Sequence, residues 1–265
     1  MVCKNPGRAC LLATLLLPGL STAAGLNDTG QTACQNDTGV VSPEPSTHPR
    51  QDCTRGRDAA AAAGVLPKTG AGSAGFDYTK IAADGSDLPV SATSWSCVRD
   101  NLTGLIWELK TNGAMPDLRD RRWTYCWYDD IHNDNNGGIA GWNCRTPEGQ
   151  CSVENFGGVC NTQTYIAAVN AAGLCGHSDW RLPIRLELQG LVHYTFAEPG
   201  PTIDSGYFPD YPYTDWTWTS STDAQNPYTA WAVSFRSGSV FPQTKVDNKG
   251  AGGAAFSVRL VRGGQ

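Results

Sequence analysis

Two segments in the second half of the chain have the apolar spacing of amphipathic helices. The first spans residues 162–172, with Asn161 or Thr162 as its N-cap and Gly173 at the C′ position. The second spans residues 183–193 and has a proline in its first turn, where a missing N–H is tolerated. Their apolar faces consist of Tyr165, Ile166 and Val169 in the first helix and of Leu188, Leu191 and Val192 in the second. We therefore expect two helices that each bury one side.

Alternating apolar and polar residues predict strands on both sides of these helices. The predicted strands are residues 76–81, 105–109, 216–222, 231–235, 239–241 and 256–261. The alternation turns Trp216, Trp218 and Trp231 toward the interior, so we interpret these rings as core residues. An order of strand, helix, helix and then several antiparallel strands indicates an α+β fold.

Residues 25–93 are rich in turn-forming residues instead. Asn27-Asp-Thr-Gly30 recurs as Asn36-Asp-Thr-Gly39, and two such turns fit a small hairpin or meander. An alanine run at residues 59–63 predicts one or two helical turns. The sequence thus predicts a small, mainly β or irregular N-terminal extension, followed by a domain over residues 94–265.

The first residues, 1–24, have the composition of a secretory signal peptide. Lys4 and Arg8 precede an apolar run at residues 11–20, and small residues then lead to a cleavage site after Ala24. An apolar run of about ten residues is too short to span a bilayer, which needs ~20. No later segment reaches that length, so we expect no membrane insertion. The pattern predicts a secreted or cell-surface protein, in the periplasm or outside the cell.

Eight cysteines remain after this cleavage, and an even number in an exported chain predicts disulfides. Their spacings contain no C-x-x-C pair, which disfavours a metal–thiolate site. The short separation of Cys34 and Cys53 favours that pair. The others would pair among themselves; they are Cys97, Cys126, Cys144, Cys151, Cys160 and Cys175. Four of them lie in the irregular stretch at residues 112–160, which we interpret as an insertion that disulfides pin.

The charge balance narrows the choice of partners. The chain has 20 Lys and Arg against 25 Asp and Glu, for a formal net charge of −5. An acidic chain without a basic stripe is a poor partner for nucleic acids, heparin-like polymers and anionic membranes. We therefore expect no nucleic-acid partner.

The densest charged motif is Asp179-Trp-Arg-Leu-Pro183, followed by Glu187. Its two carboxylates would suit a general acid and base. However, an arginine between two carboxylates keeps both of them ionised, which does not suit proton transfer. We therefore favour a structural ion-pair network of Asp179, Arg181 and Glu187, with Arg181 as a bidentate donor and Trp180 in the core. No catalytic residue is assigned.

A second polar cluster lies in a Gly-rich loop. Asp129, Asp130 and Asp134 stand there among asparagines, and hard oxygen ligands at this density suit Ca²⁺. The bidentate glutamate of an EF-hand is missing, which favours an ordinary polar turn. We expect no metal or other cofactor, with calcium at these three aspartates as the alternative.

The four histidines match no H-x-x-x-H metal motif. We expect them on the surface or at helix ends, and His193 in particular as a dipole partner near the C-terminus of the second helix.

Aromatic and amide residues crowd the loops before and between the C-terminal strands. On loops held by a rigid scaffold, Tyr and Asn form adaptable contact surfaces. The candidate ligand-binding residues are Tyr211, Tyr213, Asp215, Asp223, Asn226, Tyr228 and Arg236. The alternative is that the tyrosine rings cover the core, and the sequence does not decide between the two.

Several motifs, in their order along the chain, resemble the Lcl C-terminal domain family. They are Asn101-Leu-Thr-Gly-Leu-Ile-Trp107, Asp179-Trp-Arg-Leu-Pro183 with Glu187-Leu188, Trp218-Thr-Ser-Ser221, Ala230-Trp231 and Val258-Arg-Leu-Val-Arg262. The resemblance covers residues 95–265 and implies a C-type-lectin-like fold, with two helices packed on antiparallel strands and long loops. Members are secreted or surface proteins. The founding member is a collagen-like adhesin of a Gram-negative pathogen that forms trimers and binds sulfated glycans. The upstream half resembles the N-terminal extension of an exported bacterial branch.

The resemblance implies an exported, non-enzymatic module of a Gram-negative bacterium that binds a glycan or a surface protein through its C-terminal loops. The chain departs from the adhesin because it has no Gly-X-Y repeat and is acidic, which argues against sulfated glycans. One alternative is a structural subunit of a surface homo-oligomer or fibre, joined through residues 25–93. Another is an oxidase of the formylglycine-generating type, because C-type-lectin-like folds include these enzymes, which use a reactive cysteine pair with copper.

Overall fold

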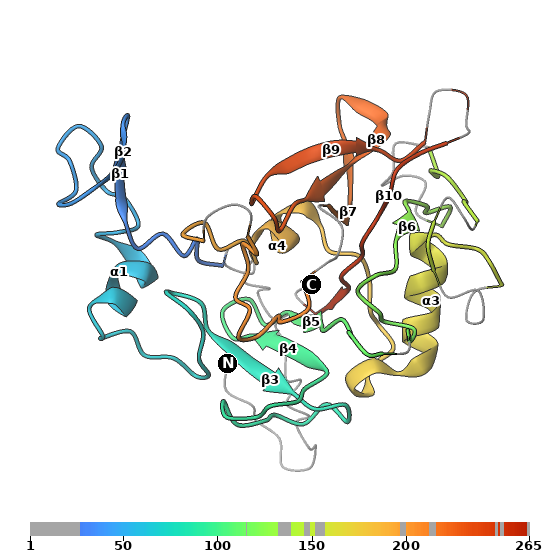
Figure 1. Cartoon of the computed structure of the whole chain (residues 1–265), viewed down its shortest axis with the longest axis horizontal. Helices are drawn as coiled ribbons and strands as arrows, with labels where there is room; N and C mark the ends of the chain where they lie inside the picture. Colours follow the sequence, from blue (N-terminus) through green and yellow to red (C-terminus); the bar gives the residue numbers. More distant parts are fainter. Residues whose placement is uncertain are drawn as a thin grey trace, which may run out of the picture.

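The computed structural model describes residues 27–114, 116–131, 139–145, 149–151, 157–196, 200–211, 216–246, 249 and 252–263. The predicted signal peptide lies outside these residues. The described chain is α+β, as predicted, with short helices and antiparallel sheets (Figure 1). Among the described residues, no helix has the length and apolar character needed to cross a membrane.

The largest sheet, which we call the main sheet, has the strand order β11-β5-β4-β3, and all neighbouring strands in it are antiparallel. Its strands are β3 (Tyr78–Ile81), β4 (Cys97–Asp100), β5 (Ile106–Glu108) and β11 (Val261–Arg262). Trp107 of β5 lies opposite Val98 of β4 and Val261 of β11. The sheet therefore joins a strand from the predicted extension to strands near both ends of the predicted C-terminal domain.

A second sheet, at the top of Figure 1, has the order β7-β8-β9. Its strands are β7 (Thr217–Asp223), β8 (Asn226–Val233) and β9 (Val240–Thr244). Two smaller sheets pair β1 (Cys34–Asn36) with β2 (Gly39–Val41), and β6 (Tyr125–Cys126) with β10 (Ala255–Phe256). All these pairings are antiparallel, and short connections join β1 to β2, β7 to β8 and β8 to β9, as antiparallel neighbours allow.

The single strand predicted at residues 256–261 is wrong. The segment is divided between β10 and β11, which belong to different sheets. Every residue from Ser257 to Val261 is buried, because the chain crosses here from one sheet to the other and is covered on both sides.

The first predicted helix is α3 (Thr162–Ala172). Asn161 is its N-cap and accepts a hydrogen bond from the backbone N–H of Thr164, 2.8 Å away. Gly173 ends it in the left-handed conformation, with φ 64°. These local signals specify the helix, and a short 3₁₀ turn, η1 (Leu174–Gly176), follows it.

The second helix is shorter than predicted, because α4 is only Arg185–Gln189. Beyond it the backbone takes distant partners: the N–H of His193 donates to the carbonyl of Thr202 and that of Tyr194 to the carbonyl of Thr29. These bonds replace the helical ones, so the prediction of a helix to residue 193 is wrong although Leu191 and Val192 are buried as expected.

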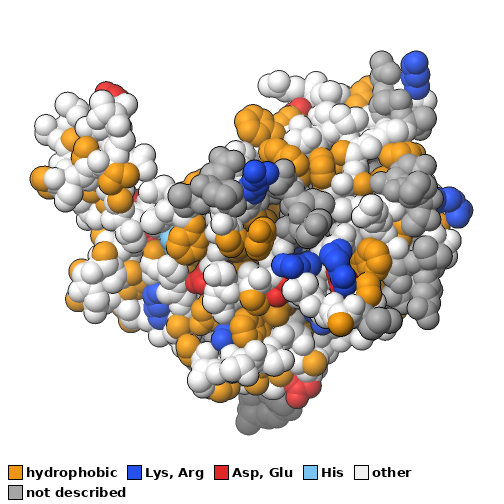
Figure 2. Space-filling view, viewed as in Figure 1, with side chains coloured by type: hydrophobic (Ala, Val, Ile, Leu, Met, Phe, Trp, Pro, Cys, Tyr) orange, Lys and Arg blue, Asp and Glu red, His pale blue; other side chains and the backbone are white. Residues whose placement is uncertain are grey.

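The two copies of the Asn-Asp-Thr-Gly motif have different roles. The second copy forms the turn between β1 and β2, whereas the first packs on the main body, where Asn27 donates a hydrogen bond to the Tyr78 hydroxyl. The predicted alanine helix is α1 (Gly56–Ala62). Figures 1 and 2 show the β1–β2 hairpin projecting as a lobe, with a notch between it and the main body on the face shown.

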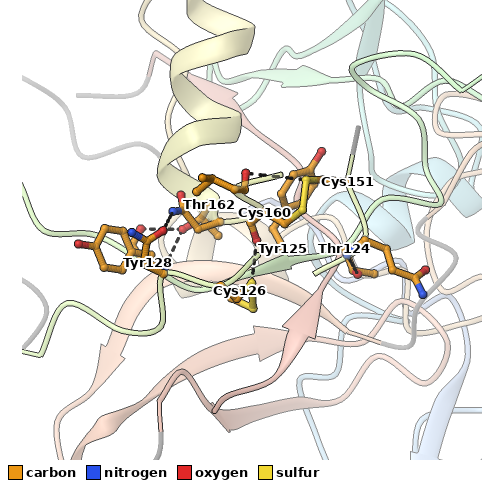
Figure 3. Close-up of a disulfide and its surroundings, with 12 residues drawn as sticks. Thr124, Tyr125, Cys126, Tyr128, Cys151, Cys160 and Thr162 are labelled. Atoms are coloured by element: carbon orange, nitrogen blue, oxygen red, sulfur yellow. Dashed lines mark hydrogen bonds between the residues drawn. A yellow bond between two sulfur atoms is a disulfide. The ribbon is translucent and has the colours of Figure 1, made fainter. Parts of the chain in front are cut away.

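All eight described cysteines form disulfides. The predicted pair Cys34–Cys53 is confirmed, and the other bonds are Cys97–Cys175, Cys126–Cys144 and Cys151–Cys160. The last two cross the irregular stretch at residues 112–160, and Figure 3 shows this region beside the start of α3. These bonds tie residues of the insertion to β6 and to the N-terminal end of α3.

The buried side chains form two groups. The first, which we call the disulfide core, comprises Ile81, Cys97, Tyr125, Cys126, Trp127, Cys144, Cys151, Cys160, Tyr165, Val169, Leu174, Cys175, Trp180, Leu182, Trp218, Ala230, Ala232, Val258 and Leu260. The second, the aromatic core, comprises Phe76, Tyr78, Val98, Leu105, Trp107, Leu109, Leu188, Leu191, Val192, Ile203, Tyr207, Phe208, Val233, Phe235 and Val261. The main sheet and β8 supply residues to both.

Of the three tryptophans expected in the core, Trp218 is fully buried, but Trp216 and Trp231 are only half-buried. The Trp231 ring lies under the guanidinium of Arg185, 4.5 Å from the ring centroid. Ala232, on the opposite face of β8, is fully buried. Because β8 is covered on both faces, the one-sided alternation expected for this strand is wrong.

Candidate functional site

The structure divides the predicted ligand-binding residues between the two ends of β8. Asp223, Asn226 and Tyr228 lie at the turn where β7 leads into β8. Arg236 is exposed and follows the opposite end of that strand. The candidates therefore do not form one surface, and the β7–β8 turn holds the larger described group.

The remaining candidates lie elsewhere. Tyr211 packs against the aromatic core, which is the core role that the sequence left open for it. Tyr213 and Asp215 lie outside the described residues.

Hydrogen bonds hold the β7–β8 turn in one shape. The Asp223 carboxylate accepts bonds from the N–H of Gln225, at 3.0 Å, and from the Thr229 hydroxyl, at 3.3 Å. The Asn226 side-chain oxygen accepts from the N–H of Tyr228, at 3.1 Å. Asn226 is exposed and Tyr228 is half-buried. The turn thus presents an amide, a carboxylate and an aromatic ring on a pre-formed backbone.

Lys245 lies beneath this turn and is fully buried. Its backbone N–H donates to the carbonyl of Tyr228, at 3.0 Å, and its ammonium donates to the Thr222 hydroxyl, at 3.2 Å. The ammonium also lies 4.3 Å from the centroid of a Trp127 ring. Burial lowers the pKa of Lys245 to about 8, while the negative charge of Asp129 acts in the opposite direction.

The loop that follows β6 also packs against β7 and Lys245. The Trp127 indole N–H donates to the carbonyl of Thr219 in β7, at 2.8 Å. The Tyr128 N–H donates to the Thr162 hydroxyl, and that hydroxyl donates to the Tyr128 carbonyl, so the loop is fixed to the start of α3 (Figure 3). The Tyr128 hydroxyl then donates to Asp130, at 3.1 Å. We call this whole arrangement the Lys245 site and define it by Thr222, Asp223, Asn226, Tyr228 and Lys245 together with Trp127, Tyr128, Asp129 and Asp130.

Two of the three aspartates considered for calcium belong to this site. Asp129 accepts the N–H of Ile131 and lies within electrostatic range of the Lys245 ammonium, whereas Asp130 is exposed. Asp134 lies outside the described residues. The buried Lys245 ammonium near Asp129 supplies positive charge from the protein itself.

A different group of carboxylates has metal-like spacing. Ligand atoms of Asp28, Asp52 and Asp58 all lie within 4.8 Å of one another. The Thr29 hydroxyl donates to Asp52 at 2.7 Å, and the N–H of Gly75 donates to Asp58 at 2.8 Å. Burial, with Asp58 nearby, raises the pKa of Asp28 to about 6. Sequence reasoning missed this group because its members meet only when the first turn packs on α1.

The charged motif before α4 forms two separate ion pairs. Arg181 donates to both oxygens of Glu187, at 2.8 Å each, in the expected bidentate geometry. Asp179 pairs instead with Arg262 in β11, which lowers the pKa of the Asp179 carboxyl. The expectation that Arg181 joins both carboxylates is wrong, because β11 brings a second arginine to Asp179. Trp180 is buried in the disulfide core.

His193 is not at a helix end, since α4 stops before it. It is 2% exposed, its ring stacks on Phe196 with 3.9 Å between ring centroids, and its Nε2 pairs with the Ser73 hydroxyl. Burial lowers its pKa. The expectation of a surface or capping histidine is therefore wrong here.

The Lys245 site contains hydrogen-bond donors and acceptors beside a partly exposed ring, which suits recognition of a polar ligand with an apolar face. Three of the predicted ligand-binding residues, Asp223, Asn226 and Tyr228, lie at this turn, whereas Lys245 and Trp127 were not among the predicted residues. No local pattern marks Lys245, because its burial depends on a tryptophan from a distant loop.

The family model described as Lcl C-terminal domain matches residues 96–262. This range contains the whole Lys245 site but not the Asp28, Asp52 and Asp58 group. No curated protein and no solved structure matches the chain.

Proposed function

Because the chain belongs to the Lcl C-terminal domain family through residues 96–262, we propose that it is an exported, non-enzymatic module that binds a glycan or a surface protein through the Lys245 site. Membership of this family suggests an adhesin-associated domain. The four disulfides indicate a compartment outside the reducing cytoplasm. A secreted or cell-surface location in a Gram-negative bacterium agrees with both.

A C-type-lectin-like fold is part of this proposal. Two helices, α3 and α4, accompany antiparallel strands, and long loops are tied by disulfides. The last strand of the family region, β11, pairs with β5 near its start, so the two ends of the region lie together. These features support the fold, with ligand recognition by loops at one end of the second sheet.

The observation that carries the proposed function is the rigid β7–β8 turn. Its side chains are already hydrogen-bonded into place, and Lys245 and Trp127 support it from below. A pre-formed site loses little conformational entropy when it binds. Tyr228 offers a face on which a sugar ring stacks, and Asn226 offers both a donor and an acceptor for hydroxyl groups.

The arrangement of cysteines supports binding rather than oxidation. An oxidase of the formylglycine-generating type would need a reactive cysteine pair, and the eight cysteines that the structure describes are all joined in disulfides. A thiol count on the exported protein tests this point: two free thiols would favour the oxidase.

The test of binding uses the mature chain on a glycan array and on whole cells. We expect binding that Tyr228→Ala reduces at least about tenfold, the equivalent of 1.4 kcal/mol. Tyr194→Ala is the control, because Tyr194 is an exposed tyrosine outside the Lys245 site. Unchanged binding by Tyr228→Ala would remove this site from the proposal.

An oligomeric role is the second candidate, and the projecting β1–β2 hairpin favours it. Deleting residues 25–93 would be a poor test, since β3 belongs to the main sheet. Removing only the hairpin and its Cys34–Cys53 bond leaves that sheet intact. Light scattering that gives the same mass with and without the hairpin would exclude it as the assembly contact.

A further inference from the structure

The chain contains three Asn-x-Thr triplets, the acceptor motif for N-linked sugars in exported proteins. They begin at Asn27, Asn36 and Asn101. So short a motif decides nothing by itself, because the side-chain amide must also be free to react. The structure distinguishes the three triplets. We infer that Asn36, the last residue of β1, carries an N-linked glycan, and that the fold withholds the other two asparagines from this modification.

The amides of the other two asparagines are engaged in the main body. The Nδ2 atom of Asn101 donates to the Asp77 carboxylate, at 2.9 Å, and to the Thr79 hydroxyl, at 3.0 Å. The Nδ2 atom of Asn27 donates to the Tyr78 hydroxyl, at 3.3 Å. A sugar on either nitrogen would break contacts with β3 and its flank, so the folded chain does not present these two amides.

The threonine of each triplet provides a second difference. In the Asn36 triplet, the backbone N–H and the hydroxyl of Thr38 both donate to Oδ1 of Asn36, at 2.9 and 2.8 Å. The hydroxyl of Thr103 donates instead to Asp100, at 2.7 Å, and that of Thr29 also donates to an aspartate. Among the described residues, a threonine hydroxyl therefore reaches the amide of its own triplet at Asn36 alone.

These bonds favour reaction at the Asn36 nitrogen. Two donors on Oδ1 stabilise the negative charge that develops there as Nδ2 loses a proton, which makes Nδ2 more nucleophilic. No described residue accepts a hydrogen bond from this Nδ2 atom. In the transfer step, Nδ2 attacks the anomeric carbon of an oligosaccharide carried on a polyprenyl pyrophosphate. The C–N bond replaces the C–O bond to the pyrophosphate, which leaves as an anion, and the amide proton passes to a base of the transferase.

The β1–β2 hairpin gives a transferase access to this triplet. Residues 37–40 are all exposed, and the hairpin projects from the main body (Figure 1). Antiparallel pairing of Asn36 with Gly39 holds the turn in shape. An open hollow of about 440 Å³ lies beside Asn36, and its walls include His48 and Pro49. The first sugar therefore has room next to the protein without displacing a core residue.

The first measurement is the mass of the exported chain, purified from the cells that make it. We expect an excess that corresponds to whole sugar residues, located on Asn36. Asn27 and Asn36 share one tryptic peptide, because no Lys or Arg separates them, so fragmentation that keeps the sugars attached must locate the site. A chain without sugar on Asn36 would overturn the inference.

Two substitutions of Thr38 test the part played by its hydroxyl. Thr38→Val keeps the branched shape but removes the hydroxyl, so the modified fraction should fall at least about tenfold, because one hydrogen bond in the transition state corresponds to roughly that factor in rate. Thr38→Ser keeps the hydroxyl and is the matched control, which should remain modified. Equal modification of the two variants would overturn the role assigned to this hydroxyl.

Transfer to folded and unfolded chains separates the effect of the fold from that of the motif. A purified oligosaccharyltransferase and its polyprenyl pyrophosphate oligosaccharide are supplied to the native chain and to the reduced, unfolded chain. We expect sugar on Asn36 alone in the native chain and on all three asparagines after unfolding. Modification of Asn27 or Asn101 in the native chain at the rate of Asn36 would contradict selection by the fold.

Discussion

The disulfide core and the aromatic core stabilise neighbouring parts of the chain in different ways. The disulfide core contains six cysteines and covers the irregular stretch before α3, where backbone pairing is sparse. The aromatic core contains no cysteine and lies against the regular main sheet. Two of its disulfides thus hold the part that lacks regular pairing, and the third joins β4 to η1, whereas the aromatic core is held by packing alone.

The comparison also concerns function, because the Lys245 site lies over the disulfide core. Trp127 is a member of that core and contacts the Lys245 ammonium. The loop that carries Tyr128 to Asp130 lies between Cys126 and Cys144, within the segment that this disulfide closes. We therefore expect perturbation of the disulfide core to affect binding first and perturbation of the aromatic core to affect global stability first.

The largest expected effect is that of Trp107→Ala in the aromatic core. Trp107 is 1% exposed and has strands on both sides, so its removal should lower the free energy of unfolding by about 4 kcal/mol. Thermal unfolding measures this change. Trp231→Ala is the matched control. Because the Trp231 ring is only half-buried, its removal should lower the free energy of unfolding by less than half as much. Equal losses from both would show that the aromatic core does not bear this stability.

The next largest effect is that of replacing Cys126 and Cys144 together by alanine. The bond closes a loop with a sequence separation of 18, which corresponds to about 3 kcal/mol in the chain-entropy account. Hydrogen exchange should show loss of protection near Trp127 and retention in β4 and β5. Ligand binding should fall in parallel. Uniform loss of protection would contradict the separation of the two cores.

A third difference is the response to alkaline pH. Lys110 contacts the disulfide core through Tyr165 and is 2% exposed, and burial lowers its pKa to about 8. The unfolded chain holds this proton up to its ordinary pKa of 10.5, so the unfolded state binds more protons between pH 8 and 10.5. Stability should therefore rise with pH from 8 to 9.5, by at most about 1.4 kcal/mol per pH unit.

Chemical denaturation at several pH values measures this slope. Lys110→Met removes the titrating group and should flatten the curve. The neighbouring groups are Glu108, Tyr165, Arg259 and Arg119. Burial raises the pKa of Tyr165, so its ionisation does not interfere below pH 10. A slope that survives in Lys110→Met would assign it to another group, with Lys245 as the first to examine.

The smallest expected effect is at acid pH in the aromatic core. His193 packs on Phe76, 5.3 Å between ring centroids, and burial holds its pKa below the ordinary 6.5. The unfolded state then binds the proton first as pH falls below 6.5, so stability falls in that direction. Asp28, with its pKa raised to about 6, has the opposite sign, because its stabilising proton is lost as pH rises through 6.

The difference between wild type and His193→Phe isolates the histidine. We expect the free energy of unfolding of the wild type, relative to that of the variant, to fall by less than about 1 kcal/mol between pH 6.5 and 5. A wild-type curve that is no steeper than that of the variant would exclude His193 as the cause.

Some elements followed from the sequence because neighbouring residues specify them. The helix α3 begins and ends at the predicted residues, since Asn161 and Gly173 act within one turn of its ends. The Cys34–Cys53 bond could also be predicted from the sequence, because a short loop favours it. The family was identified from motifs that the matched range contains. The sequence also placed Asp223 and Asn226 near a strand end, because polar residues at a turn need no distant partner.

Tertiary structure alone decided the rest, and in each case a partner far along the chain competes with the local pattern. The helix α4 ends early because Thr29 and Thr202 take the backbone bonds of Tyr194 and His193. Asp179 binds Arg262 rather than Arg181 because β11 lies beside it. The Lys245 ammonium lies against Trp127 and donates to Thr222 of β7, two residues far from it in the sequence. Local sequence determines conformations whose hydrogen bonds close within a few residues. Burial and charge pairing depend instead on which distant part of the chain packs against a residue. At the Lys245 site, that part is the disulfide-bonded loop after β6.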